Sequence, residues 1–346
     1  MKTIGILICL VLLFCQPVQA QQIQAPEAPD EAAELMPEEQ DSFARDLWYV
    51  LCAALKKLEP ELVYSIKLCL AAVCTSLLVC LAGALHSSAK TVTELVGTVA
   101  IAVLYLKDAG LLIRGATDAI SQLSDYAKLL LPVMGSALAA QGGVTSSTAL
   151  YTGTAVFDAL LSGLISKLIS PMIYIFLALS IGYRALGDQM LDKFQRFIKW
   201  AMTWCLKTLL YVFTGYMTIT GVVSGTADQA ALKATKLTIS GMVPVVGSIL
   251  SDASEAVVVG AGTVKNAVGI YGLVAIFAIA VSPFLKIGIH YLLLKIGCAL
   301  CSVFGSKSTS GLMEDLSSAM GLLLGMTGAV CLMLTISLVC FMKGMS

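Results

Sequence analysis

Long runs without charged residues constrain the fold of this sequence most strongly. Of its 346 residues, 58% are hydrophobic and 13% are charged, whereas a typical soluble domain has about 25% charged residues. A helix of about 20 apolar residues crosses the ~30 Å hydrocarbon core of a bilayer. We therefore predict an all-α, polytopic integral membrane protein in contact with membrane lipids. The uncharged runs are Leu68–Leu85, Thr208–Ala227, Asn266–Leu285 and Leu316–Met342.

Residues 1–20 have the pattern of a secretory signal peptide. Lys2 precedes an apolar stretch from Ile4 to Cys15, and the segment ends in Val18-Gln19-Ala20, a small-x-small cleavage pattern. Because the apolar stretch is short and is followed by Gln and Pro, we predict that the peptide is cleaved. An uncleaved anchor helix is the alternative.

Residues 21–46 form an acidic lead-in, with eight Asp or Glu residues and the single basic residue Arg45. This composition predicts a disordered extracytoplasmic segment, which would serve either as a partner-docking arm or as a spacer. The chain after residue 46 has 20 basic and 14 acidic residues, so the lead-in and the body have opposite charge.

The distribution of basic residues predicts the orientation of the spans. Residues 47–116 are expected to hold two spans, Leu62–Leu85 and a weaker Leu95–Ile113. The stretch Arg184–Lys207 is the most basic connection, which places it in the cytoplasm by the positive-inside rule. Its aromatic residues fit either an interfacial amphipathic helix or the anchors of a span at Ala201–Val223. Six to eight crossings fit the whole chain.

A repeated motif divides the remainder of the chain. The sequence LPVMGSAL at Leu131–Leu138 recurs as VPVVGSIL at Val243–Leu250, and the Ser-Pro pairs at 170–171 and 282–283 have the same offset of 112 residues. We therefore predict two tandem repeats, 117–226 and 229–346.

Each repeat is expected to contain a helix that is broken by Pro and Gly, and that is re-entrant if it lines a cavity. A proline removes a backbone donor, and irregular backbone at membrane depth is tolerated where it is buried or lines a pathway. Ordinary helix kinks are the alternative. The predicted pathway residues are Pro132, Gly135, Gly142, Gly143, Ser147 and Thr148 in the first repeat, and Pro244, Gly247, Ser251, Asp252, Ser254 and Glu255 in the second.

Charged residues within apolar segments are costly and therefore mark candidate functional positions. The strongest are Asp158, Lys167 and Lys286. Asp158 could pair with Lys167 or with a lysine of the other repeat, or take up a proton during transport. Snorkelling to the membrane surface explains the lysines equally well.

Catalytic chemistry is not indicated. The chain has two histidines, His86 and His290, which are too few for a His-based metal site, and its lone Cys298-x-x-Cys301 lies in an apolar segment. Gly305–Thr309 lacks the spacing of a phosphate-binding loop, and a basic nucleic-acid-binding module is absent from the sequence. We predict no enzyme activity, no cofactor, no metal site and no nucleic-acid partner.

The stretch VPVVGSILSDASEAVVVGAGTVKNAVGIYG, from Val243 to Gly272, resembles the stage III sporulation protein AE family of endospore-forming bacteria. The N-terminal segments, the early hydrophobic helices and the Pro-Gly-Ser element near Leu131 are also similar, so the resemblance covers about residues 40–346. It implies a multi-pass protein of the mother-cell membrane that faces the forespore. It also implies partners that are other sporulation channel proteins, in a multiprotein channel or secretion-like complex.

Two other functions remain open from the sequence. A stand-alone secondary transporter of a small solute would use the two broken elements as its binding site, and a non-conducting membrane scaffold would only recruit partners. Small-residue spacings such as Gly321-x-x-x-Gly325 also allow close helix contacts, including those of a homo-oligomer.

Overall fold

The predicted all-α class is confirmed for the residues that the computed structural model describes. These are 25–37, 43–85, 90–242, 247–303 and 307–343; the side chains of 90 and 221–265 are outside this description. Every element is helical. The elements are α2 (Asp30–Ala33), α3 (Phe43–Lys57), α4 (Glu59–Leu85), α5 (Lys90–Ala140), α6 (Val144–Leu164), the π-helical turn η2 (Ile165–Ile169), α7 (Ser170–Leu186), α8 (Gln189–Met242), α9 (Gly247–Val303) and α10 (Lys307–Lys343).

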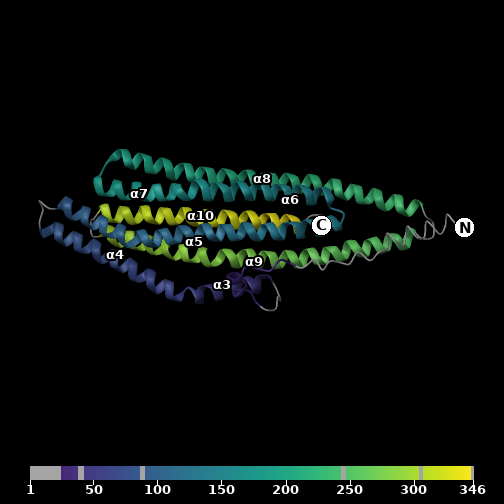
Figure 1. Ribbon diagram of the computed structural model, residues 1–346, viewed down its shortest axis with the longest axis horizontal. Helices are drawn as coiled ribbons and strands as arrows, with labels where there is room; N and C mark the ends of the chain where they lie inside the picture. The colour runs from purple at the N-terminus through teal and green to yellow at the C-terminus, as the bar shows by residue number, and fades with distance from the viewer. Residues whose placement is uncertain (1–24, 38–42, 86–89, 243–246, 304–306, 344–346) are drawn as a thin grey trace.

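Long helices that follow one another in the chain run antiparallel in an elongated bundle (Figure 1). Helices α4, α5 and α9 lie on one side, α6, α7 and α8 lie on the other, and α10 packs between them. The core is filled by large side chains such as Tyr126, Phe176, Phe213 and Phe341. Helices α4, α7 and α9 end, and α5, α8 and α10 begin, at the same end of the bundle, which we call the loop end (Figure 1).

Five of the described helical segments are long and apolar enough to cross a membrane, so this is a multi-pass membrane protein. They are Glu59–Leu85, Thr91–Ala140, Val144–Leu186, Asn266–Val303 and Lys307–Lys343. The longest helices exceed what a crossing requires. Helix α5 has 51 residues, which at 1.5 Å per residue is about 77 Å, against a hydrocarbon core of ~30 Å.

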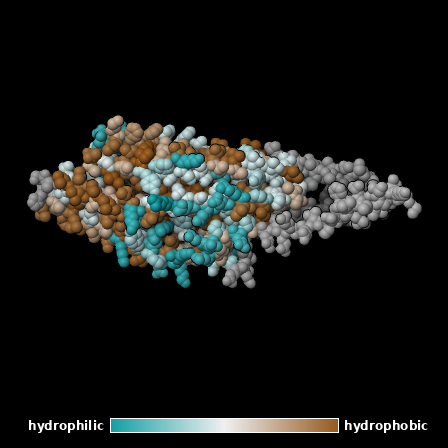
Figure 2. All heavy atoms as spheres, viewed as in Figure 1, coloured by the Kyte–Doolittle hydropathy of each residue, from teal (hydrophilic) through white to brown (hydrophobic). Residues whose placement is uncertain are grey.

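The surface of α5 changes character along its length. From Val92 to Leu106 its exposed large side chains are apolar. The exposed side chains of the next part include Lys107, Arg114, Asp118, Asp125 and Lys128. Figure 2 shows the same change on one face of the molecule, where brown hydrophobic surface dominates toward the loop end and a hydrophilic patch lies in the middle. The first part of α5 therefore suits lipid, and the following part suits water.

The helix break in the first predicted repeat lies at Gly142 and Gly143, whereas the prediction of a break at Pro132 is wrong. Gly142 has φ 92°, a left-handed conformation that glycine adopts without steric cost. Pro132 lies inside the continuous helix α5. Its ring is on the exposed face, where the hydrogen bond lost to the Lys128 carbonyl costs least.

The structure does not show the two repeats as similar units. At offset 112, the break at 141–143 corresponds to residues 253–255, which lie within the continuous helix α9. The Ser-Pro pairs also differ, because Pro171 is at the start of α7, directly after η2, whereas Pro283 is inside α9. A π-helical turn before Pro171 accommodates a residue that cannot donate its backbone hydrogen bond.

Part of the acidic lead-in packs against the bundle, so the prediction of disorder is wrong for residues 25–37, which we call the N-terminal arm. Ala28, Ala32 and Leu35 are buried in the core. The Tyr126 hydroxyl donates to the Pro26 carbonyl at 3.4 Å. The composition of the segment predicted disorder because acidic residues are frequent in it. In the structure these acidic side chains face outward, and the apolar side chains face the bundle. The predicted signal peptide lies outside the described residues.

Helix α8 continues without interruption from Gln189, so the structure has no separate interfacial helix between Arg184 and Lys207. Phe194, Phe197, Trp200 and Trp204 are exposed along it. Trp200 and Trp204 stack with ring centroids 6.2 Å apart. This arrangement fits aromatic anchors on the outer face of a long helix.

Candidate functional site

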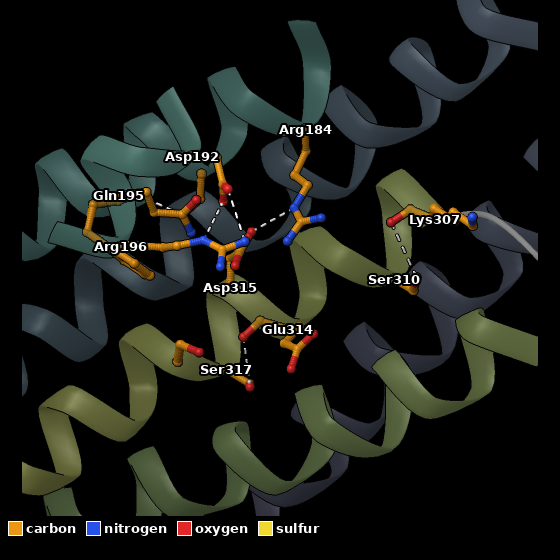
Figure 3. Close-up of polar contacts among 12 residues, drawn as sticks. Arg184, Asp192, Gln195, Arg196, Lys307, Ser310, Glu314, Asp315 and Ser317 are labelled. Carbon is orange, nitrogen blue, oxygen red and sulfur yellow. Dashed lines mark hydrogen bonds and ion pairs between the residues drawn. The ribbon is translucent and has the colours of Figure 1, made fainter. Parts of the chain in front are cut away.

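The most concentrated group of charged contacts lies at the loop end, where α7, α8 and α10 meet (Figure 3). The Arg184 Nε of α7 donates to Asp315 Oδ2 of α10 at 2.8 Å, and the two side chains are 24% and 12% exposed. The Arg184 guanidinium also lies over the Tyr183 ring, 4.9 Å from its centroid. This ion pair is largely shielded from solvent, so breaking it leaves an uncompensated charge.

A glycine makes room for this ion pair. A Cβ placed on Gly311 of α10 would lie 2.4 Å from the Arg184 Cζ and 2.2 Å from its Nη1. Gly311 precedes Asp315 by one helical turn, so the guanidinium rests on the backbone of α10 beside its carboxylate partner. Helix α10 therefore provides both the carboxylate of Asp315 and, at Gly311, the room for the guanidinium.

Neighbouring polar contacts tie α8 into the same group. The Gln195 side-chain amide donates to the Ser180 hydroxyl of α7 at 2.8 Å, in a buried contact. Arg196 contacts Asp192 through two nitrogens on the exposed face of α8. The Lys199 ammonium donates to the Ser318 hydroxyl of α10 at 2.9 Å. Three helices that are far apart in sequence are thus held together at the loop end.

A second polar group joins α4, α5 and α9, and it contains the predicted residue Lys286. The Lys286 Nζ lies 3.3 Å from Glu61 Oε1. The Tyr64 hydroxyl donates to both carboxylate oxygens of Asp108, at 3.0 and 3.2 Å. His290, which is buried, shares a hydrogen bond of 3.2 Å with the Ser65 hydroxyl. Lys286 is therefore paired with an acidic residue of another helix.

Asp158 lies apart from both groups, between α5 and α6. It is 4% exposed, and the Ser124 hydroxyl donates to its Oδ2 at 2.5 Å, while its Oδ1 has no hydrogen-bond partner among the described residues. The structure does not bring it together with Lys167, which is exposed within η2. The predicted pairing of Asp158 and Lys167 is wrong, because these residues are nine positions apart along nearly continuous helix and face different directions.

Some of the remaining predicted pathway residues lie in the described part of the structure, and the others lie outside it. Ser147 is buried and donates to the Gly135 carbonyl at 2.6 Å, so these two residues connect α6 to α5. Thr148 is exposed and bonds the Val144 carbonyl within α6. Gly247 begins α9. Pro244 and the side chains of Ser251, Asp252, Ser254 and Glu255 lie outside the described residues.

Sequence reasoning missed the Arg184–Asp315 pair because 131 residues separate its members. It placed Arg184 only within a basic connection and did not consider Asp315. The signal that could have found the pair is an acidic residue near the start of a long apolar helix, since such a charge needs a partner. In the described part of the chain, no three His, Cys, Asp or Glu side chains gather in an arrangement that could hold a metal ion.

The long antiparallel helices, their apolar outer surface and the ion pair between them define an α-helical multi-pass membrane protein. The comparison with known families is more specific. The chain belongs to the stage III sporulation protein AE family, whose model matches residues 32–344. It is 24% identical over 237 residues to stage III sporulation protein AE of Bacillus subtilis (strain 168). The match covers 68% of this chain and 59% of that relative, and no solved structure matches.

Proposed function

We propose that this protein is a membrane subunit of a multiprotein channel or secretion-like complex between the mother cell and the forespore. It would reside in the mother-cell membrane that surrounds the forespore. Membership of a stage III sporulation family supports the role in endospore formation. The multi-pass architecture supports a position within the membrane.

One observation carries the proposal: the bundle is longer than a bilayer is thick, and the surface of α5 becomes charged beyond Leu106. A subunit that connects two membranes needs contact surface outside its own bilayer. The part of α5 that follows Lys107, together with the N-terminal arm docked beside it, provides a water-compatible surface for other subunits.

The orientation follows from the charges. Arg184, Lys193, Arg196 and Lys199 are at or near the loop end, which the positive-inside rule assigns to the cytoplasm. The N-terminal arm and α3 lie away from that end (Figure 1). In our proposal, the arm therefore contacts partners in the space between the two membranes.

A stand-alone secondary transporter is the second candidate, and buried Asp158 favours it. A carboxyl group in an apolar bundle with one hydroxyl partner resembles the proton sites of transporters. A non-conducting scaffold would need neither Asp158 nor a pathway. Solute flux in vesicles containing only this protein would distinguish the transporter from both alternatives.

The test of the main proposal is affinity purification of the full chain from mildly solubilised sporulating cells, followed by quantitative mass spectrometry. We expect other sporulation membrane proteins at stoichiometric levels. An abundant unrelated multi-pass protein, purified in parallel with the same tag, controls for co-solubilised membrane. Recovery as an isolated monomer or homo-oligomer would contradict the proposal.

The orientation has its own test. Reporter fusions should place residues near Lys193 in the cytoplasm and residues near Glu34 outside it. If both positions report the same side of the membrane, the proposed exposure of the arm to partners is wrong.

A further inference from the structure

A cavity of about 560 Å³ lies between the N-terminal arm, the end of α3, α5 and α9. Its size is in the range of ligand-binding pockets. The wall that α5 contributes begins at Gly115 and ends at Gln122, within the charged part of that helix. The cavity therefore lies beside the water-compatible surface of α5 and not beside its apolar part.

Small residues create the space. A Cβ placed on Gly115 would have no neighbour within 4 Å. Ala119 of α5 and Ala278 of α9 are buried and also line the cavity, and Ala32 and Leu35 of the arm line one side. The floor is therefore apolar, and it suits the aliphatic part of a ligand.

The two lysines that line the cavity already have acidic partners. Lys57 Nζ lies 2.8 Å from Glu34 Oε2, and Lys286 Nζ lies 3.3 Å from Glu61 Oε1. These ion pairs balance the positive charge of the lining. The charge that remains at the rim therefore comes from the other lining residues.

Glu31 and Asp118 give the rim an excess of negative charge. Neither carboxylate forms an ion pair with a residue that the structure describes, although Arg114 lies one turn before Asp118 on α5. The hydrogen bond from Lys57 goes to Glu34, so Glu31 acts on that lysine only from a greater distance. Two carboxylates on different elements are thus open to a cation.

Pro283 of α9 adds a backbone acceptor to the same cavity. Proline has no N–H, so it cannot donate to the carbonyl four residues earlier, which belongs to Ile279. Residues four apart share one face of a helix, and both of these residues line the cavity. Ile279 is buried, so its carbonyl is left to accept from a donor within the cavity.

These groups all accept hydrogen bonds, and two of them carry negative charge. The matching ligand is a cation with several N–H donors, such as an ammonium with three or a guanidinium with five. A metal ion fits less well. Among the residues that the structure describes, the acidic side chains of this rim do not gather closely enough to form a metal-binding group.

We propose that this cavity binds an organic cation through an ammonium or guanidinium group. The group donates to the Asp118 carboxylate and the Ile279 carbonyl, and Glu31 of the arm faces it across the rim. Its aliphatic stem lies on the floor of the cavity. The cation is a lysine or arginine side chain of a partner subunit, or a free polyamine. The partner source rests on the proposed complex, whereas binding of the cation by the isolated chain does not.

The test uses the full chain purified in mild detergent, with binding measured by ligand-observed NMR. The probes are spermidine, N-acetylarginine methylamide and its neutral isostere N-acetylcitrulline methylamide. We expect both cations to bind, and the neutral compound to bind about tenfold more weakly than the arginine compound. E31Q/D118N should weaken binding of both cations by about fivefold or more. Failure of both cations to bind, or unchanged binding in E31Q/D118N, would overturn the proposal.

A matched variant separates the cavity from general charge. E27Q/D125N makes the same change in net charge on the same two elements, at exposed residues that do not line the cavity. It should bind both cations as the unsubstituted protein does. If the two double variants lose binding equally, the attraction is non-specific and the proposal fails.

The carbonyl of Ile279 has a separate test. P283A gives α9 an N–H donor for this carbonyl while keeping every charged residue, and we expect it to weaken binding of both cations by about threefold or more. P132A is the control, because Pro132 is also inside a helix but does not line the cavity. Equal binding by P283A and P132A would overturn the proposed contact with the carbonyl.

The source of the cation is determined with the purified complex. If a basic side chain of a partner occupies the cavity, the complex should no longer bind spermidine, and E31Q/D118N should weaken the hold on that partner. If the natural ligand is a free polyamine, the complex should bind spermidine as the isolated chain does. Absence of any complex would contradict the proposed function alone, because the isolated chain still tests the cavity.

Discussion

Asp315 and Asp158 are both buried carboxyl groups on long helices, but they are stabilised in different ways. Asp315 lies near the loop end and pairs with Arg184. Asp158 lies farther from that end, and among the described residues its hydrogen-bond partner is the hydroxyl of Ser124. The first arrangement fixes two helices through opposite charges, whereas the second leaves one carboxyl oxygen without a partner. The comparison teaches that burial alone does not define the role of an acidic residue in the bundle.

The largest expected effect comes from removing the cation of the first arrangement. R184A leaves Asp315 buried without its partner, and we expect a loss of about 3 kcal/mol of stability. Thermal unfolding of the purified protein in detergent measures this as a lower melting temperature. The double variant R184A/D315A should lose less than R184A, since no uncompensated charge remains.

R196A is the matched control for this prediction. Arg196 and Asp192 form an exposed pair on α8, so its removal should leave the melting temperature nearly unchanged. Equal losses in R184A and R196A would show that the burial of the Arg184–Asp315 pair has no energetic importance.

Isosteric substitution of the two acidic residues sharpens the comparison. We expect D315N to destabilise the protein by about 2 kcal/mol, because it weakens a hydrogen bond between charged groups. D158N should be neutral or stabilising, because it keeps a hydrogen-bond acceptor for Ser124 and removes a carboxyl group that makes no ion pair with the residues that the structure describes. Melting temperatures that fall equally in both variants would contradict this distinction.

Filling the space beside Arg184 should have a smaller effect on stability. G311A places a Cβ against the guanidinium, and we expect a loss of about 1 kcal/mol as Arg184 shifts from Asp315. G110A, at a helical glycine with no neighbour within 4 Å, should be neutral or stabilising because alanine favours the helix. The difference in melting temperature between the two variants is the measurement.

Breaking the exposed ion pair between Glu34 of the N-terminal arm and Lys57 of α3 should have the smallest effect on stability. The Lys57 ammonium, 2.8 Å away, holds the pKa of Glu34 below its usual value, and the Glu34 carboxylate raises the pKa of Lys57. The Glu34 carboxylate therefore contributes to the stability of the folded arm above its unfolded-state pKa. This contribution is lost as the pH falls through the lowered pKa. The contribution from Lys57 is lost as the pH rises through its raised pKa.

Limited proteolysis of the arm measures this pH dependence. We expect slightly faster cleavage in acid and at strongly alkaline pH than near neutrality, and K57Q should remove the difference. Because the pair is exposed, added salt should also weaken it. Cleavage of K57Q with the same pH profile as the unsubstituted protein would exclude a role for this contact.

The fold class was predictable because it depends on local composition. Uncharged runs of span length and the Gly142-Gly143 pair predicted membrane helices and a break between two of them, and both are present. Pro132 misled the prediction, since a proline on an exposed helix face need not interrupt the helix. The prediction of disorder at residues 25–37 was also wrong, because average composition does not report the spacing of the buried residues Ala28, Ala32 and Leu35.

The candidate site was less predictable because it depends on contacts between distant segments. Lys286 was singled out as a charged residue in an apolar segment, and its partner Glu61 lies in another helix. Lys167 and a lysine of the other repeat were both open as partners of Asp158, but the helix turns Asp158 and Lys167 in different directions. The pairing of charges across a bundle requires the relative rotation of its helices, and hydrophobic periodicity does not fix that angle.

The length of α5 has a mechanical consequence. In the arrangement proposed above, Lys107 lies at the membrane surface, and the residues up to Ala140 extend by about 50 Å as one continuous helix. A helix braced by neighbours along its side resists bending, so the far tip stands at a set height above the lipid. A partner anchored in an opposing membrane would meet it at that height, and the gap between the two membranes would be set partly by the number of residues in a single helix.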